Sequence, residues 1–397
     1  MEPRIAAKPQ QFEESVIRLM TRLCVAVDGI NLAQGFPDFP APQAIKDAAC
    51  AAILADVNQY AITWGAPALR EAIAAKYGPA LGRDLDPERE ITVVCGATEA
   101  MLAAVMAVVD PGDEVVVFEP FYENYGPDAV LSGARPHYVP LLPPDAAGGA
   151  WRFDADALAA AFGPRTRAIV VNTPHNPTGK VFTRGELAQI AGLCQQWNVV
   201  AITDEIYEHL VYEGKHVRLA TLPGMWERTI TISGLSKTYS VTGWRLGYLL
   251  APERLTVPIR RIHDFLTVGA AAPLQEAGAV ALRLPPAYYA DLLAAYAERR
   301  AVVCTGLAAA GFHVYPPAGA YYVMTDVAAL TAADGAAGDD VAFVRAMIER
   351  VGVAAVPGSS FYADPARGRT QVRFAFPKRR ETLEAAMRRL AELRARV

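Results

Sequence analysis

The chain has 397 residues, of which 52% are hydrophobic and 20% are charged. This is enough apolar material for large buried cores and too much for one small domain, so we expect two domains. The formal net charge of -4 and the absence of a Lys/Arg track disfavour nucleic acid as a partner. The N-terminal segment MEPRIAAKPQQFEES lacks the apolar run of a secretory signal, and no long uncharged window follows. We therefore expect no membrane span and a cytoplasmic location.

Cysteine and histidine spacing predicts neither disulfides nor a metal centre. The five cysteines are far apart and form no CxxC pair, and the six histidines show no HExxH or comparable spacing. We expect reduced cysteines and no bound metal.

Residues 45–290 alternate helical patterns with short apolar runs, the rhythm of an α/β domain with a largely parallel sheet. Thr183 and Glu186 form the pattern of a capping box at the start of a helix that joins two strands. The expected strands are Ile91–Cys95, Glu114–Glu119, Ala168–Asn172, Val199–Thr203, Thr229–Ser233 and Gly247–Leu250.

The pattern changes after residue 290. A long Ala/Leu/Arg helix comes first, then short strands at Ala320–Met324 and Gln371–Phe376, then a closing helix. We expect residues 291–397, together with residues 1–44, to form a smaller domain.

A loop after the strand at Thr229–Ser233 carries Lys237 in the segment SGLSKTYSVTGWRLGY. An amine among small polar residues can reach a ligand, and Arg245 lies eight residues further on. On this segment alone, a solvated surface lysine remains the alternative.

Asp204 stands at the carboxyl end of the strand Val199–Thr203, with Tyr207 three residues later in DEIY. Ligands of open α/β sheets bind at this edge. A carboxylate there can pair with a protonated ring nitrogen, or it can cap a helix by accepting backbone N–H groups.

Two other segments offer short amides and backbone donors. Asn172 and Asn176 bracket the rigid turn NTPHNPTGK, and the glycine-led helix start CGATEAMLAAVMAVV can direct N–H groups of Ala97, Thr98 and Glu99 at a phosphate. The alternatives are a common turn and an unliganded helix.

Together these segments supply what a site for pyridoxal 5'-phosphate (PLP) requires. Such a site needs a lysine, an acid for the pyridine nitrogen, donors for the ring hydroxyl, an aromatic over the ring, a phosphate cradle and a cation for the substrate carboxylate. No single segment is decisive, but the combination favours PLP chemistry.

The order and spacing of NPTG, DEIY and SK with GWR resemble the class I/II aminotransferases of PLP fold type I. The similarity extends from NLAQGFPDFPAP to VRFAFPK, and the kynurenine, glutamine and methionine aminotransferase branch is the most similar in look. The resemblance implies an α/β fold whose large domain has a mostly parallel seven-stranded sheet covered by helices, plus a smaller α+β domain. It also implies a PLP-dependent, ping-pong transfer of an amino group from an amino acid to a 2-oxo acid.

The resemblance assigns the catalytic roles. Lys237 would carry the cofactor as a Schiff base and move the proton, and Asp204 would pair with the pyridine nitrogen. Asn176 and Tyr207 would bind the ring oxygen, and Tyr122 would stack on the ring.

The resemblance also implies a phosphate site formed by Ala97, Thr98, Arg245 and a serine. Ser236 is the first choice for that serine and Ser233 the second.

Substrate binding is assigned in the same way. Arg373 in QVRFAF would clamp the substrate carboxylate with its planar fork, assisted by Asn172 and the backbone of Gly35. A surface arginine on an edge strand is the alternative for Arg373. Tyr60 would reach the phosphate of a partner subunit, which implies a homodimer with shared active sites.

The walls of the substrate pocket are less well defined by the sequence. Phe36, Trp64, Tyr125 and Tyr322 are candidates, and each is equally a core aromatic. No second arginine for a dicarboxylate can be assigned, so a neutral aromatic or sulfur-containing amino acid is expected.

Two rival functions remain. A PLP-dependent carbon–sulfur β-lyase or other elimination enzyme would share the same residues and differ in its products. A non-catalytic PLP-binding regulator would need a helix-turn-helix extension, and the first forty or so residues contain NLAQGFPDFPAP instead.

Overall fold

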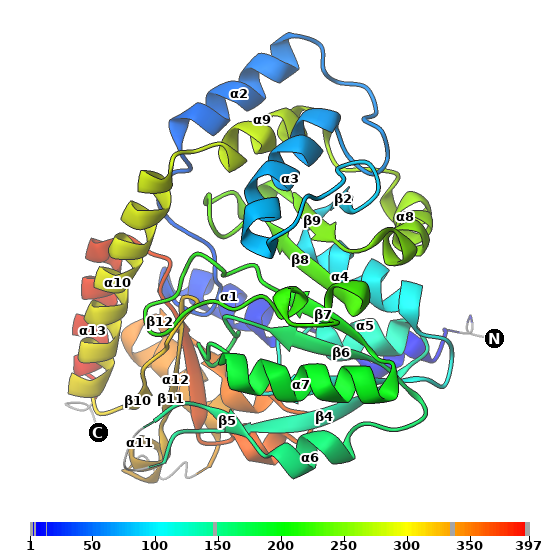
Figure 1. Ribbon diagram of the computed structural model, residues 1–397. Helices are drawn as coiled ribbons and strands as arrows, with labels where there is room; N and C mark the ends of the chain where they lie inside the picture. The colour runs from blue at the N-terminus through cyan, green and yellow to red at the C-terminus, as the bar shows by residue number, and fades with distance from the viewer. Residues whose placement is uncertain (1–2, 4, 13, 146–148, 334–337, 394–397) are drawn as a thin grey trace.

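A computed structural model describes residues 3, 5–12, 14–145, 149–333 and 338–393. The described residues contain one large sheet and one smaller sheet (Figure 1). The strands of the large sheet, in spatial order, are β2 Ile91–Val94, β9 Gly247–Leu250, β8 Thr229–Gly234, β7 Val200–Asp204, β6 Thr166–Asn172, β3 Glu114–Glu119, β4 Arg135–Leu142 and β5 Arg152–Phe153.

The large sheet is mostly parallel, as expected, but within the described residues it has eight strands rather than seven. Strands β4, β3, β6, β7 and β8 pair in parallel, whereas β9 is antiparallel to both of its neighbours. The eighth strand, β5, pairs only Phe153 and Arg152 with β4. Two residues carry no alternating pattern, which is why the sequence gives no signal for β5.

Helices cover both faces of the sheet because successive side chains of each strand point to opposite faces. Val115 and Val117 of β3 pack with α4 Gly96–Val108, α5 Tyr125–Leu131 and α8 Glu253–Thr267. Val116 and Phe118 pack on the other face with α6 Ala155–Ala160 and α7 Arg184–Trp197. Near β2 and β9 the sheet is covered by α3 Pro67–Leu81 and α9 Ala272–Leu282, and α9 also packs against α2 Gln43–Leu54.

The predicted capping box is confirmed at the start of α7. The Thr183 hydroxyl accepts the backbone N–H of Glu186, and the Glu186 carboxylate accepts the backbone N–H of Thr183. This box fixes where the helix begins after the NPTG turn.

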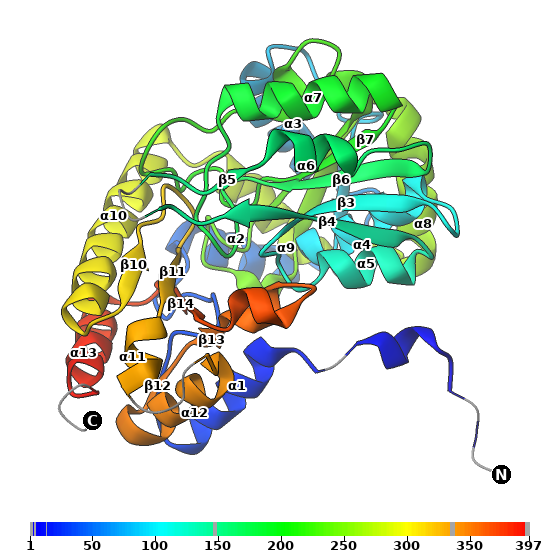
Figure 2. The same cartoon turned by 90° about the horizontal axis from the view of Figure 1, so that it is seen from below.

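The smaller sheet has the strand order β10-β11-β14-β13 in the described part of the chain. Its strands are β10 His313–Tyr315, β11 Tyr322–Asp326, β14 Gln371–Ala375 and β13 Val356–Pro357. Around it pack α1 Val16–Ala26, α10 Pro286–Ala309, α12 Asp340–Val351 and α13 Arg380–Ala391 in one hydrophobic core (Figure 2).

An N-terminal segment and a C-terminal segment of the chain pair beside this smaller sheet. β1 Ile30–Asn31 pairs in parallel with β12 Val353–Ala354, so the N-terminal segment packs with the C-terminal part. This arrangement supports the expected grouping of residues 1–44 with 291–397, whose boundaries stay a proposal. No helix in the described ranges is long and apolar enough to cross a membrane.

Candidate active site

A cavity of about 540 Å³ opens where the carboxyl ends of β6 and β7, the start of α4 and the smaller sheet meet. The sequence-predicted residues that line it are Gly35, Ala97, Thr98, Tyr122, Asn172, Asn176, Asp204, Tyr207, Ser236, Lys237, Arg245 and Arg373. Tyr60 does not line it. Because β6 and β7 are parallel, Asn172 and Asp204 end at the same edge and are register partners.

Asp204 is a buried carboxylate held by two hydrogen bonds. Its Oδ2 accepts the Tyr125 hydroxyl at 2.7 Å, and its Oδ1 accepts the backbone N–H of Ile206 at 3.2 Å. Burial raises the pKa of Asp204, and the Tyr125 hydrogen bond opposes that rise. Among the described residues no Lys or Arg forms an ion pair with it, so its charge is left for a cationic group in the cavity. The helix-cap alternative is wrong, because the backbone N–H of Ile206 belongs to a turn and no described helix begins there.

Lys237 reaches into the same cavity and is not a surface lysine. Its Nζ donates to the backbone carbonyl of Gly35 at 3.3 Å. Burial and the positive charge of Arg245 lower the pKa of Lys237 to about 8, which the negative charge of Asp204 partly offsets. Because the pKa is lowered, a larger fraction of this amine is neutral and nucleophilic near physiological pH than for an ordinary lysine.

Arg373 lies in β14 between β11 and β13 and is almost fully buried, so the edge-strand alternative is wrong. Its Nη1 donates to Asn176 Oδ1 at 2.9 Å and its Nη2 to the Ala33 carbonyl at 2.7 Å. Asn172 Oδ1 in turn accepts the backbone N–H of Asn176 at 2.7 Å. The buried Nε of Arg373 has no hydrogen-bond partner among the described residues. This guanidinium therefore suits a carboxylate ligand.

The opposite end of the cavity offers donors for an anion. α4 begins at Gly96, and Arg245 Nη2 donates to Thr98 Oγ1 at 3.3 Å beside the first turn of that helix. Helix N-termini and guanidinium groups both attract phosphate. Ser236 lines the cavity, whereas Ser233 donates to Glu208 Oε1 at 3.0 Å outside it, so the second choice of serine is wrong.

Aromatic rings form the remaining walls. Tyr122 and Tyr125 lie with ring centroids 5.7 Å apart in an edge arrangement, and the Tyr207 hydroxyl is 3.0 Å from that of Tyr322. Phe36 also lines the cavity, as expected. Trp64 does not: its indole N–H donates to Glu88 and Arg260 stacks on its ring. Its expected place in this chain's pocket is therefore wrong.

The sequence reading missed three features of the site. Tyr125 was expected as an apolar wall, yet it bonds the key carboxylate. Tyr321 donates to the Gly35 carbonyl at 2.7 Å and so helps to hold the loop that Lys237 contacts. Arg18 of α1 lines the cavity mouth. Only Tyr125 had a sequence signal, because EPFYENY places it three residues after Tyr122.

The residues present fit PLP. The Lys237 amine with its lowered pKa suits an aldehyde, the Asp204 carboxylate, which no described Lys or Arg pairs with, suits a protonated ring nitrogen, and the start of α4 with Arg245 suits a phosphate. The expected role of each residue stays a prediction.

Comparison with known proteins agrees with this geometry. The family described as "Aminotransferase class I and II" matches residues 27–390. The probable N-succinyldiaminopimelate aminotransferase DapC of Mycobacterium tuberculosis is 42% identical over 395 residues, which are 97% of each chain. Human kynurenine–oxoglutarate transaminase 1 is 38% identical over 90% of each chain, and the methionine aminotransferase of Escherichia coli is 36% identical over 98% of each chain.

Solved structures give the same result. The N-succinyldiaminopimelate aminotransferase of Mycobacterium tuberculosis superposes with a TM-score of 0.92, covering 98% of this chain and 100% of that one. A methionine aminotransferase of Escherichia coli superposes with a TM-score of 0.91 at 35% identity, with the same coverage of both chains. The similarity therefore includes the whole architecture and not only the site motifs.

Proposed function

Because the chain belongs to the class I and II aminotransferases, which are PLP-dependent enzymes, we propose that it moves the α-amino group of a neutral aromatic or sulfur-containing L-amino acid to a 2-oxo acid. The observation that carries the proposal is the pairing, in one cavity, of a lysine with a lowered pKa and a buried carboxylate without an ion-pair partner in the described part of the chain. The kynurenine and methionine aminotransferases among the relatives support the substrate class.

Each proposed catalytic step is assigned to particular residues of the chain. Arg373 binds the substrate carboxylate and so orients Cα, while Asn176 holds that guanidinium in place. With PLP bound, the Lys237 amine would take the proton from the substrate Cα and hold it on Nζ for return. Asp204 holds a proton on the pyridine nitrogen, and PLP, when bound, supplies the electron sink for the carbanion.

The test is a half-reaction followed by absorption. PLP-loaded enzyme is mixed with a panel of amino acids without an acceptor, and a 2-oxo acid is then added. We expect methionine, kynurenine or phenylalanine to convert the cofactor to its amine form, and the oxo acid to restore it. Release of ammonia and pyruvate with an unchanged cofactor would instead establish the β-lyase.

A matched pair of lysine variants completes this test. Lys237→Ala should abolish the conversion, because the amine that moves the proton is gone, while Lys215→Ala, in an exposed loop, should convert normally. A fully active Lys237→Ala enzyme would contradict the mechanism.

A second substrate class is favoured by one observation. The Arg18 guanidinium lines the cavity mouth, and none of the described residues forms a hydrogen bond or an ion pair with it. A free arginine at that place suits a distal carboxylate, as in the substrate named for the 42% identical mycobacterial relative.

The two substrate classes are separated by Arg18→Gln. For a donor with a distal carboxylate, we expect KM to rise about tenfold, since a charge-assisted contact is lost. The KM for methionine should not change. Arg22→Gln is the matched control, because Arg22 is on the same helix, pairs with Glu14 and does not line the cavity. If Arg18→Gln has the same KM as the unmodified enzyme for every donor, this second substrate class is ruled out.

The expected homodimer belongs to the same proposal. Thr98 and Arg245 are exposed, so the phosphate end of the cavity is open in a single chain, and Tyr60 is 88% exposed. A second copy that brings its Tyr60 to this end would close it. The cytoplasmic location stays a prediction.

A further inference from the structure

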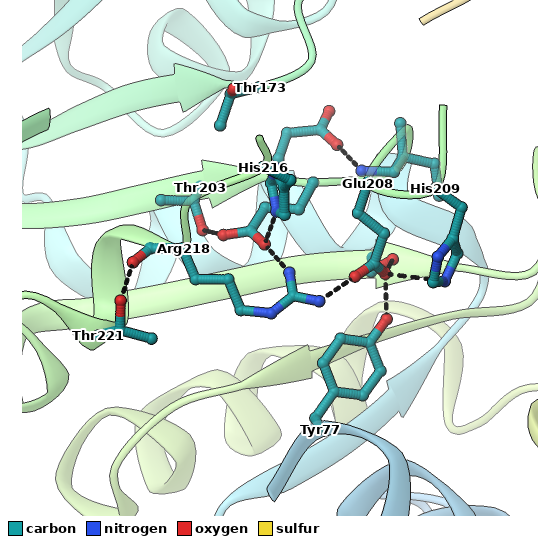
Figure 3. Close-up of polar contacts among 12 residues, drawn as sticks. Tyr77, Thr173, Thr203, Glu208, His209, His216, Arg218 and Thr221 are labelled. Carbon is teal, nitrogen blue, oxygen red and sulfur yellow. Dashed lines mark hydrogen bonds and ion pairs between the residues drawn. The ribbon is translucent and has the colours of Figure 1, made fainter. Parts of the chain in front are cut away.

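A buried group of charged side chains lies behind the turn that follows β7. Glu205, Glu208 and Arg218 form this support cluster. Figure 3 shows Glu208 and Arg218 together with Tyr77 of α3. Both carboxylates are fully buried and Arg218 is nearly so. Burial of three charged groups is costly unless each is paired and hydrogen-bonded.

Every carboxylate oxygen of the cluster has a donor. Glu205 Oε1 accepts the Thr203 hydroxyl at 3.1 Å, and its Oε2 accepts His216 Nε2 at 2.7 Å and Arg218 Nη1. Arg218 Nη2 donates to Glu208 Oε2, so one guanidinium bridges both carboxylates. The cluster is therefore a closed network.

Glu208 connects the cluster to two other elements. Its Oε1 accepts the Tyr77 hydroxyl from α3 and the Ser233 hydroxyl, at 3.0 Å, from β8. Tyr77 also lies 2.8 Å from the hydroxyl of Tyr248 in β9. The cluster thus joins the turn after β7 to the strand that leads into the Lys237 loop.

The end of β7 and the turn after it present different residues to two sides. Asp204 and Tyr207 line the active-site cavity, whereas Glu205 and Glu208 do not and point to the cluster instead. Ser233 lies four residues before Lys237. The cluster consequently contacts the segments that carry Asp204 and Lys237 on the side away from the cavity.

A metal site is the competing explanation. Ligand atoms of Glu205, Glu208 and His216 lie within 4.8 Å of one another. However, the Arg218 guanidinium already bridges both carboxylates, so a metal ion would have to displace a buried cation. Every carboxylate oxygen has a protein donor without a metal, and His216 Nδ1 is the ring nitrogen that has no partner among the described residues.

We propose that Arg218 is a positioning residue, which fixes the distance between Asp204 and Lys237 through Glu205, Glu208 and Ser233. This inference rests on the proposed function, because it concerns the residues that would bind PLP. No contact links Arg218 itself to the cavity among the described residues.

Arg218→Lys tests the proposal, because lysine keeps the charge but cannot bridge two carboxylates with a planar fork. We expect the dissociation constant for PLP to rise about tenfold and kcat to fall roughly tenfold to a hundredfold, measured well below the unfolding temperature. The matched control is Arg228→Lys, since Arg228 donates to the Cys194 carbonyl and to Asn198, away from the cavity. This control should lower only the thermal midpoint.

A purely structural role makes a different prediction. It would lower the melting temperature of the Arg218→Lys apoprotein and leave PLP affinity and kcat per folded site unchanged, and that result would overturn the proposal. If Arg218→Lys does not fold, Ser233→Ala keeps all charges and removes the hydroxyl that links β8 to Glu208 and that also interacts with Tyr248 of β9. It should weaken PLP binding, and unaltered affinity and kcat would also overturn the proposal. Failure of the unmodified enzyme to bind PLP would refute the proposed function instead.

Discussion

Asp204 and Lys237 illustrate how burial determines the chemistry of single residues. Burial disfavours the charged form of each group, so it raises the pKa of the carboxyl and lowers that of the amine. The hydrogen bond from Tyr125 opposes the first shift. The hydrogen bond thus favours the anionic form of Asp204 against the effect of burial, while burial makes the Lys237 amine easier to deprotonate than an ordinary lysine.

The Lys237 amine makes a pH prediction at this scale. Its pKa of about 8 lies below the ordinary value of 10.5, so the reactive neutral form grows as pH rises towards 8. Covalent uptake of PLP by the apoprotein should therefore speed up about tenfold per pH unit below 8 and level off above it. Stopped-flow absorption measures this rate. If the rate of PLP uptake keeps rising up to pH 10, the pKa of Lys237 is not lowered and this prediction is wrong.

Tyr125→Phe tests the hydrogen bond to Asp204. Loss of a hydrogen bond to a buried carboxylate costs about 1.5–3 kcal/mol. We expect Asp204 to bind a proton more readily, and the PLP affinity and kcat each to fall at least about tenfold. Tyr138→Phe is the control, because Tyr138 packs on the same core without contacting Asp204. The measurements are equilibrium cofactor binding and steady-state kinetics, and equal values for both variants would contradict this role.

Prediction from sequence succeeded best for residues at strand ends. Asn172 and Asp204 were identifiable because parallel strands end at one edge of a sheet, and the structure brings them to one cavity. Trp64 and Arg18 were misjudged or missed, because the direction of a loop or helix side chain depends on tertiary packing. The role of Tyr125 could not be predicted, because the sequence does not show that its hydroxyl lies next to Asp204 Oδ2.

At the scale of elements, the start of α4 depends on one glycine. Gly96 has a φ of +85°, and a Cβ built on it would lie 2.7 Å from Arg245 Nη2. A side chain there would both strain the backbone and displace the guanidinium from the expected phosphate site.

Gly96→Ala should therefore weaken PLP binding about tenfold or more, as measured by cofactor titration. Gly192→Ala in α7 is the matched control, because nothing lies within 4 Å of its added methyl group. That control should leave PLP affinity unchanged and stabilise the protein by about 1 kcal/mol. Equal cofactor affinities in the two variants would refute the argument.

Elements with strong periodic patterns were also predictable. The strands at Glu114–Glu119 and Gly247–Leu250 have the expected bounds, because short apolar runs mark doubly covered strands. β4 Arg135–Leu142 had no such signal, since it contains two prolines and several polar residues. Proline is tolerated in β4 because it lies towards the edge of the sheet, next to the short β5.

At the scale of the whole molecule, exposed apolar side chains gather near the end of α8 and the loop after α2. Phe265 is 92% exposed and Leu54 is 84% exposed. The Thr63 carbonyl accepts His263 Nε2 at 2.8 Å, which ties that loop to α8. Side chains this apolar are typical of a surface that another copy covers.

Phe265→Asp should therefore convert the expected dimer to a monomer. A buried charge in an apolar interface is strongly unfavourable. Sedimentation velocity measures the change, and cofactor retention should fall with it because the partner's tyrosine no longer reaches the phosphate end. Leu142→Asp, on β4, is a control at a comparably large apolar side chain. A Phe265→Asp protein of unchanged mass would place the interface elsewhere.

The pairing of β1 with β12 and the position of Arg373 in β14 have a consequence for biosynthesis. A ribosome releases Asp204 and Lys237 well before the residues that complete their cavity. Until residue 373 emerges, the nascent chain has the residues expected to bind the cofactor but lacks the arginine expected to bind a substrate. Likewise, β1 cannot pair until β12 is made, more than three hundred residues later. Arg373 is the last of the cavity-lining residues in chain order, so the cavity can be completed only near the end of synthesis, and chains that stop short of β14 lack the expected substrate-binding arginine.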